Sequence, residues 1–290
     1  MQNRGLVSPT LVRQARCPHL ASRGSMRRLH LFELEDFDWV PRVVRDGGTD
    51  LLDLGFGRLG FYDGVAPKLL ALLEATGASR MVDLCSGGGG GTLSMRSRVR
   101  GAGLDVEIVL SDRNPNEAGM ARVSALGDAR TTYRAEPVDA MSGGGEVEGV
   151  RTMSGALHHF RPDAVRALIA GVVARGEPLA FFDVAASRAI RKAPLALAPV
   201  LMLPNMLLLF LGSLLLVPLV RPFRVSRVAL TYLLPLIPAL VAWDGTVSAL
   251  RAYTPEELLE LARSAPGAER YVWEAGTAGS ALYLTGIPAP

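Results

Sequence analysis

Residues 81–91 have the sequence MVDLCSGGGGG, a short apolar segment followed by five consecutive glycines. The segment 81–84 predicts a buried strand, and the residues from Thr92 to about Arg100 predict a helix after the glycines. A glycine-rich turn between a strand and a helix lets the backbone approach a ligand closely, because helix N–H groups point toward that ligand. The pattern therefore predicts a ligand site at the carboxyl end of this strand. A flexible loop that binds nothing is the alternative.

Strand and helix patterns alternate on both sides of this turn, which predicts a parallel sheet covered by helices on both faces. The other expected strands are 106–110, 133–135, 150–154 and 179–182, and the other expected helices are 66–74, one that begins at Asn114-Pro115, and 161–174. The end of the chain differs. Two apolar segments, 271–273 and 281–284, are separated only by a glycine-containing loop and predict an antiparallel hairpin. Thr254 to Glu257 form a predicted capping box before a helix.

An acidic residue lies at the end of each of the first two strands, Asp83 and Asp112. A pyrophosphate close to Asp83 would meet an unfavourable negative charge, which disfavours a dinucleotide. The glycines are not followed by Gly-Lys-Ser/Thr, so a P-loop is excluded. A carboxylate at Asp83 suits a ligand with a positively charged amino group. S-adenosylmethionine has such a group, together with a cationic sulfonium and a ribose.

At these residues the chain resembles the class I S-adenosylmethionine-dependent methyltransferases. Residues 82–89 look like the first motif of that family, an acid followed by glycines at alternate positions. Asp83, Gly87 and Gly89 match the spacing, and Cys85 replaces the usual first glycine. The resemblance covers roughly residues 66–185 and 252–287. It implies a Rossmann-like, seven-stranded, mostly parallel sheet with S-adenosylmethionine as the cofactor.

The resemblance also assigns cofactor contacts outside the first motif. Asp112 is similar to the acid that binds both ribose hydroxyls, and a carboxylate suits two O–H donors. Residues 138–140 resemble the segment whose acid, here Asp139, and following backbone, here Ala140, contact the adenine. Ser154 lies at the end of the fourth strand, at the edge that faces the methyl group in this fold, and is assigned to the same site.

Methyl transfer needs alignment and a deprotonated nucleophile more than a covalent intermediate. His158 and His159 follow the fourth strand and are candidate general bases, because histidine takes a proton near neutral pH. The alternative is that they pack near the cofactor without moving a proton. Asp183 follows the fifth strand and is a candidate for positioning the substrate, or for capping a turn. The aromatic residues upstream are candidates for a lid over the cofactor, with core packing as the default: Phe32, Phe37, Trp39, Phe56, Phe61 and Tyr62.

Composition excludes several other classes. Hydrophobic residues make up 49% of the 290 residues and charged residues 20%, so the chain is not disordered as a whole. Only Cys17 and Cys85 are present, too few for a disulfide framework or a zinc site, and we expect no metal. A basic stripe with interleaved aromatic residues is absent, and so is the family's Asn-Pro-Pro-aromatic signature. We therefore expect no nucleic-acid partner.

Two uncharged runs, 193–220 and 228–243, interrupt the core pattern. A spanning helix needs about 20 apolar residues, and we expect prolines to interrupt both runs and Asp244 to end the second. The basic residues around them are Arg188, Arg191, Lys192, Arg221, Arg224 and Arg227. A buried structural insertion and a pair of spanning helices are two interpretations. We favour a membrane-embedded or re-entrant hairpin whose arginines meet anionic headgroups.

The expected organisation is a basic, disordered tail at 1–28, an N-terminal lid and S-adenosylmethionine-binding core at 29–192, a hydrophobic membrane-associated insertion at 193–243, and the C-terminal part of the core at 244–290. The expected function is methyl transfer from S-adenosylmethionine to a hydrophobic or membrane-resident small molecule, on the cytoplasmic side of a membrane. Two alternatives are a membrane-anchored binding or scaffold protein with a degenerate methyltransferase fold, and a nicotinamide-dependent oxidoreductase, which Asp83 disfavours.

Overall fold

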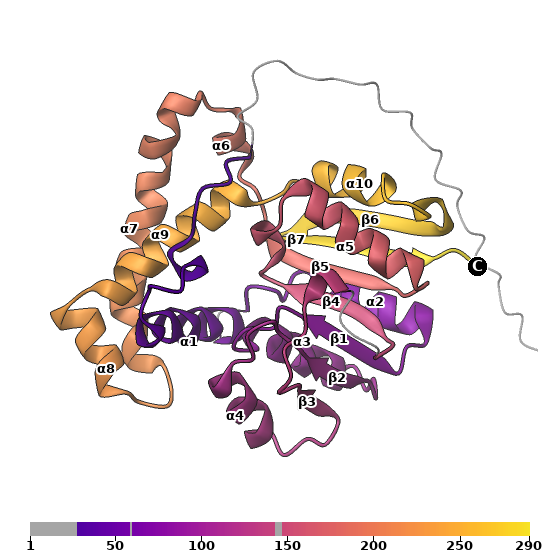
Figure 1. Ribbon diagram of the computed structural model, residues 1–290, viewed down its shortest axis with the longest axis horizontal. Helices are drawn as coiled ribbons and strands as arrows, with labels where there is room; N and C mark the ends of the chain where they lie inside the picture. Colours follow the sequence, from indigo (N-terminus) through magenta and orange to yellow (C-terminus); the bar gives the residue numbers. More distant parts are fainter. Residues whose placement is uncertain (1–27, 59, 143–146) are drawn as a thin grey trace, which may run out of the picture.

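The computed structural model describes residues 28–58, 60–142 and 147–290, so nearly all of the expected basic tail lies outside the described residues (Figure 1). Within these residues, one seven-stranded sheet has the order β3-β2-β1-β4-β5-β7-β6. Strands β1 to β5 pair in parallel, whereas β7 pairs antiparallel with β5 and with β6. The strands are β1 Arg80–Leu84, β2 Glu107–Leu110, β3 Thr131–Tyr133, β4 Val150–Ser154, β5 Leu179–Val184, β6 Tyr271–Ala278 and β7 Ala281–Pro288. This confirms the expected α/β fold, a Rossmann-like sheet closed by an antiparallel hairpin.

Helices cover both faces of the sheet, because the strand residues alternate between two cores. Met81 belongs to a core that includes α2 and α3, whereas Val82 belongs to a core that includes α5 and α10. The helices around the sheet are α2 Ala66–Thr76, α3 Gly90–Gly101, α4 Glu117–Ala125, α5 Pro162–Ala174 and α10 Pro255–Arg263. Short 3-10 helices connect them: η1 Leu34–Asp36, η2 Ala140–Ser142, η3 Leu157–His159 and η7 Ala268–Arg270.

The ends of these elements confirm one sequence prediction and correct two. Thr254 forms the expected capping box: its hydroxyl accepts the N–H of Glu257, whose side chain accepts the N–H of Thr254. The helix after β2 begins two residues later than expected, because the side chain of Asn116, rather than that of Asn114, accepts the N–H of Gly119. The third strand, β3 Thr131–Tyr133, begins two residues before the expected segment 133–135.

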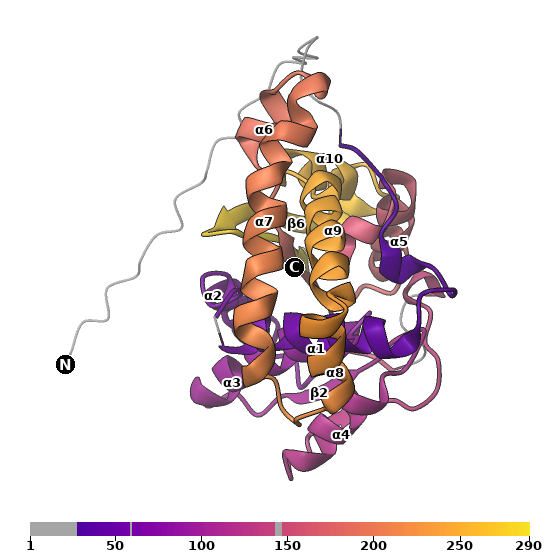
Figure 2. The ribbon, with the colours of Figure 1, turned by 90° about the vertical axis from the view of Figure 1, so that its left-hand side faces the viewer.

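A helical layer, consisting of α1 Arg42–Arg58, α7 Ala198–Leu216 and α9 Leu236–Arg251, lies beyond the carboxyl ends of the parallel strands (Figures 1 and 2). Short elements link its helices: α6 Arg188–Lys192, η4 Leu195–Leu197, η5 Val217–Leu219, α8 Val225–Val228 and the π-helix Ala229–Leu233. Its core contains Val44 of α1, Val217 after α7 and Ile237 of α9. Helices α7 and α9 approach closely at Gly245, where a Cβ would lie 2.7 Å from Leu209 Cδ1.

The first apolar run differs from expectation in its prolines, whereas the second is broken at a proline as expected. Pro199 lies in the first turn of α7, where a missing N–H costs nothing, and Pro204 lies inside α7 without ending it. The chain bends by 77° between the π-helix and α9, at the break that contains Pro235. Asp244 ends the uncharged run but not the helix that contains it, because α9 continues to Arg251. The expected domain boundary at 243 therefore lies inside a helix.

Candidate functional site

The glycine loop between β1 and α3 has a left-handed backbone at three alternate positions. Cys85, Gly87 and Gly89 have φ angles of +55°, +50° and +86°. Cys85 is the residue that replaces the usual first glycine, and its positive φ explains why glycine is favoured there. A Cβ on Gly91 would lie 2.8 Å from Ser154 Cβ, so a side chain there would press on the end of β4. Glycine is therefore required both by the turn and by its close approach to β4.

Asp83 is fully buried at the end of β1, and its carboxylate accepts three hydroxyl groups. Ser86 Oγ lies 2.6 Å from Asp83 Oδ2 and Thr152 Oγ1 lies 2.7 Å from Oδ1, while Thr92 Oγ1 also donates to Oδ2. Burial raises the pKa of Asp83, and these hydroxyl groups oppose that shift. Asp83 therefore holds the loop, α3 and β4 together. Its direct contact with a ligand amino group stays a prediction.

Asp112 lies beside the same loop at the end of β2 and is partly exposed. Its Oδ2 accepts the N–H of Gly87 at 2.9 Å, and its Oδ1 accepts the N–H of Asn114 at 2.8 Å. The Val138 N–H donates to the Asp112 carbonyl at 2.8 Å and so brings the 138–140 segment to this edge. There the side chain of Asp139 is exposed and Ala140 is buried. The structure therefore brings together the four segments that the sequence assigned to the cofactor site, namely 82–89, Asp112, 138–140 and Ser154.

Two residues of the N-terminal region complete this edge. Asp53, on α1, accepts the N–H of Gly90 at 2.9 Å and pairs with Arg122. Tyr62 is fully buried beside the loop, where a Cβ on Gly155 would lie 2.9 Å from its Oη. Among the described residues, Tyr62 Oη is one of few buried side-chain atoms without a hydrogen-bond partner. A buried hydroxyl without a partner is costly.

His158 and Asp183 form a buried pair at the ends of β4 and β5. Asp183 Oδ1 lies 2.8 Å from His158 Nδ1, and Asp183 Oδ2 accepts the backbone N–H of His158 at 2.7 Å. Both residues are at most 5% exposed. These two bonds fix the imidazole with Nδ1 toward Asp183 and leave Nε2 as the nitrogen that faces away from the sheet. The two positions lie at the same edge of the sheet, as the sequence indicated, and their direct contact is a finding of the structure.

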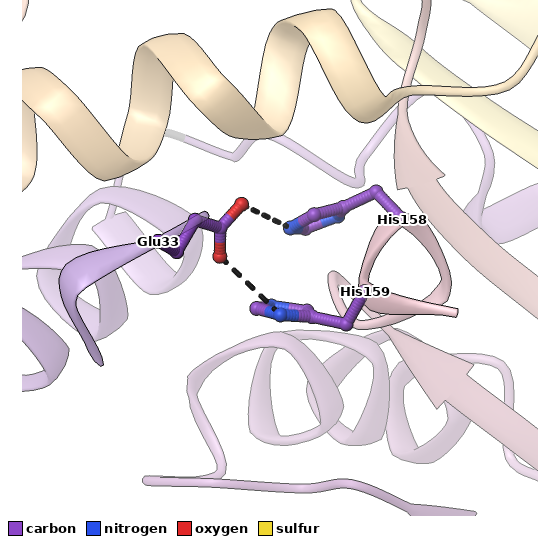
Figure 3. Close-up of side chains that lie close together, drawn as sticks. All are labelled: Glu33, His158 and His159. Carbon is purple, nitrogen blue, oxygen red and sulfur yellow. Dashed lines mark ion pairs between the residues drawn. The ribbon is translucent and has the colours of Figure 1, made fainter. Parts of the chain in front are cut away.

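A second carboxylate, that of Glu33 in the N-terminal segment, lies beside the two histidines (Figure 3). Glu33 Oε1 lies 3.8 Å from His158 Nε2, and Glu33 Oε2 lies 3.3 Å from His159 Nδ1. Arg251 of α9 lies 3.2 Å from the Glu33 carboxylate, and Ser248 donates to it at 3.1 Å. Glu33 is fully buried, and burial raises its pKa to about 7.

Glu33, His158 and His159 also have their ligating atoms close enough together to hold a metal ion, all within 4.8 Å. Arg251 Nη1, however, lies 3.2 Å from Glu33 Oε1 and 3.4 Å from His159 Nδ1. A metal ion would meet this guanidinium, which already supplies a positive charge to the cluster. The sequence expectation of no metal stays a prediction.

Sequence reasoning missed Glu33, Asp53 and Arg251. Each makes its contact with a segment far away in the chain: Asp53 is 37 residues from Gly90, and Arg251 is 92 residues from His159. No local spacing marks such a contact. The expected lid is divided. Phe56, Phe61 and Tyr62 form one aromatic group beside the glycine loop, whereas Phe32, Phe37 and Trp39 are exposed on the N-terminal segment.

No family model and no curated protein matches the sequence. Solved structures do match the fold. An O-methyltransferase family protein from Burkholderia thailandensis superposes with a TM-score of 0.50 at 14% identity, over 83% of this chain and 59% of that chain. Human N-acetylserotonin methyltransferase, in complex with S-adenosylmethionine, gives a TM-score of 0.49 at 12% identity, over 86% of this chain and 58% of that chain.

A plantazolicin methyltransferase gives a TM-score of 0.45 at 8% identity, over 86% of this chain and 98% of that chain. The chain spans less than two thirds of the length of the first two structures, 59% and 58%. At these identities the likeness concerns the fold alone. The protein has the fold of the class I S-adenosylmethionine-dependent methyltransferases, as the sequence motifs implied.

Proposed function

We propose that the protein binds S-adenosylmethionine at the carboxyl ends of β1 and β2 and transfers its methyl group to a small hydrophobic molecule. The observation that carries the proposal is the left-handed glycine loop whose Gly87 N–H is bound by Asp112 on the neighbouring strand. This arrangement leaves a partly exposed carboxylate beside Gly87, the one glycine of the loop where a Cβ would meet no described atom within 4 Å. A ribose with two adjacent hydroxyl groups fits such a carboxylate.

The residues of this edge fit the cofactor in two further respects. The loop is open at Gly87, where a Cβ would meet no described atom within 4 Å, and the Tyr62 hydroxyl is a buried donor without a partner among the described residues at the same edge. The partly exposed carboxylate of Asp112 gives the edge a negative potential, which suits a ligand that carries a sulfonium and an ammonium group. S-adenosylmethionine, when bound, supplies a methyl group that a nucleophile on the acceptor displaces from sulfur.

The acceptor would lie between the ends of β4 and β5 and the helical layer. Asp183 holds His158 Nδ1, so Nε2 is available to take a proton from the acceptor nucleophile. Glu33 faces that Nε2, and a carboxyl group with a pKa of about 7 can hold or release a proton at neutral pH. The exposed apolar side chains of the helical layer, such as Leu208 and Leu215, support a hydrophobic acceptor.

Cofactor identity is tested by thermal unfolding with added ligands. A ligand that binds only the folded state stabilises it by mass action, by about 2.7 kcal/mol at a concentration of 100 times its Kd. We expect S-adenosylhomocysteine to raise the Tm and NADH and NADPH to leave it unchanged. A rise with NADH and none with S-adenosylhomocysteine would assign the site to an oxidoreductase. Binding without methyl transfer to any acceptor in a lipid extract would support the scaffold alternative.

A further inference from the structure

Helix α7 is apolar, and the face that does not pack on α9 is exposed. The most apolar window of 18 residues within Ala198–Leu219 has a mean hydropathy of 2.4, yet only 17% of that window is buried. Its outer face includes Val200, Leu203, Leu207, Leu208, Leu211 and Leu215, all exposed. Leu208 and Leu215 are 70% and 76% exposed. A contiguous apolar surface of this kind indicates a partner, because water alone does not stabilise it.

The charge around this face indicates what the partner is. Residues 193–243 contain no aspartate or glutamate. Exposed basic side chains lie at both ends of α7: Lys192 before it, and Arg221 and Arg224 after it. An apolar surface flanked by basic residues and free of acids is complementary to a bilayer with anionic headgroups. A second copy of this chain would bring the same basic residues together and is disfavoured for that reason.

Both ends of α7 are fastened to the same globular body. Before α7, Arg191 of α6 pairs with Glu257 of α10. After α7, the buried Arg227 of α8 pairs with the buried Asp50 of α1. Along its length, Asn205 donates to Thr246 of α9 at 3.2 Å.

Helix α9 cannot accompany α7 across a bilayer, because it is part of the core. It buries Asp244, whose carboxylate accepts the N–H groups of Leu34 at 2.6 Å and Glu35 at 3.1 Å. It also buries Arg251, which contacts Glu33 in the candidate site. A spanning α7 would have to place one of its two fastened ends on the far side of the membrane. The apolar length of α7 is sufficient for a span, but its connections exclude one.

We propose that α7 lies in the plane of one leaflet of an anionic bilayer, with its outer face in the acyl region and its flanking basic residues at the headgroups. Of the three interpretations that the sequence left open, this one makes α9 the buried structural helix and α7 the membrane-embedded one. The inner side of the layer then faces the candidate site, so an acceptor dissolved in the leaflet is separated from the methyl-transfer edge by one helical layer. Only this last consequence depends on the proposed function.

Vesicle sedimentation tests the surface. The full chain is mixed with vesicles of phosphatidylcholine containing phosphatidylglycerol, and with vesicles of phosphatidylcholine alone. We expect binding to the anionic vesicles and weaker binding to the neutral ones. The double variant Leu208→Ser, Leu215→Ser removes two exposed apolar side chains and is expected to lower the vesicle affinity at least about tenfold. The control Val272→Ser alters a 64% exposed apolar residue on β6 and is expected to bind as the unaltered protein does.

Labelling with a membrane-impermeant maleimide tests the orientation. Ala196→Cys and Ser226→Cys place thiols at exposed positions near the two ends of α7, in a chain that also carries Cys17→Ser. Each protein is added from outside to preformed, sealed anionic vesicles. Labelling at both positions supports the in-plane helix. Protection of one position until the vesicles are opened would overturn it in favour of a spanning helix. A soluble oligomer that does not bind vesicles would overturn the membrane partner itself, whatever the outcome of cofactor binding.

Discussion

The glycine loop and the outer face of α7 belong to opposite kinds of surface. In the loop, Asp83, Asp112 and Asp53 each accept hydrogen bonds from the loop or from its neighbours. On α7, large leucines are exposed with no described residue over them. The glycine loop therefore suits a small polar ligand, whereas the outer face of α7 is stabilised only by contact with a large apolar surface. Substitutions in the loop should therefore weaken cofactor binding without changing vesicle binding, and substitutions on α7 should do the reverse.

The largest loss of unfolding free energy is expected at the buried ion pair between Asp50 of α1 and Arg227 of α8, the element that follows α7. Asp50→Ala leaves the buried Arg227 without its carboxylate and also removes a partner of Arg122. An uncompensated buried charge costs about 3 to 5 kcal/mol of unfolding free energy. The control Asp63→Ala breaks the exposed pair with Arg98 and should cost less than about 1 kcal/mol. Urea unfolding measures both. Equal losses would mean that the α8 connection does not hold the helical layer.

The sequence predicted the first region far better than the second. Local rules determine the loop: alternate residues need a positive φ, and an acid lies at the end of each of the first two strands, β1 and β2. Thr254 and Glu257 likewise lie at capping-box spacing. Composition could not distinguish α7 from α9, because both runs are uncharged and rich in leucine. Which of them is buried depends on long-range partners such as Asp50 for Arg227, 177 residues apart. Pro204 also gave a false signal, because a solvent-facing proline is tolerated within α7.

A smaller effect, a dependence of stability on pH, is expected from Glu33, which lies between the two regions. Its pKa is raised from 4.5 to about 7 in the folded protein by burial. Between these values the folded state keeps a proton that the unfolded state releases, so stability falls as the pH rises from about 5 to about 7. The loss reaches about 3 kcal/mol at 1.36 kcal/mol per pKa unit.

Glu33→Gln removes this titration while it keeps the shape of the side chain. The variant should match the unaltered protein at pH 5 and exceed its unfolding free energy at pH 8. Urea unfolding at both pH values measures the difference. Other titrating groups, such as Asp244 with a pKa raised to about 6 by burial, remain in both proteins and cancel in the comparison. Parallel stability curves for the two proteins would show that Glu33 is ionised in the folded state throughout.

The most direct measurement is a calorimetric titration of S-adenosylhomocysteine into the unaltered protein, Asp112→Ala, Asp163→Ala and the double variant Leu208→Ser, Leu215→Ser. Asp112→Ala removes the acceptor for two ribose hydroxyls, each worth about 1 kcal/mol, so the Kd should rise at least tenfold. Asp163 is an exposed acid on α5 outside the site, and both Asp163→Ala and the α7 double variant should keep the original Kd. An unchanged Kd for a folded Asp112→Ala, or no binding to the unaltered protein, would contradict a cofactor site at this edge.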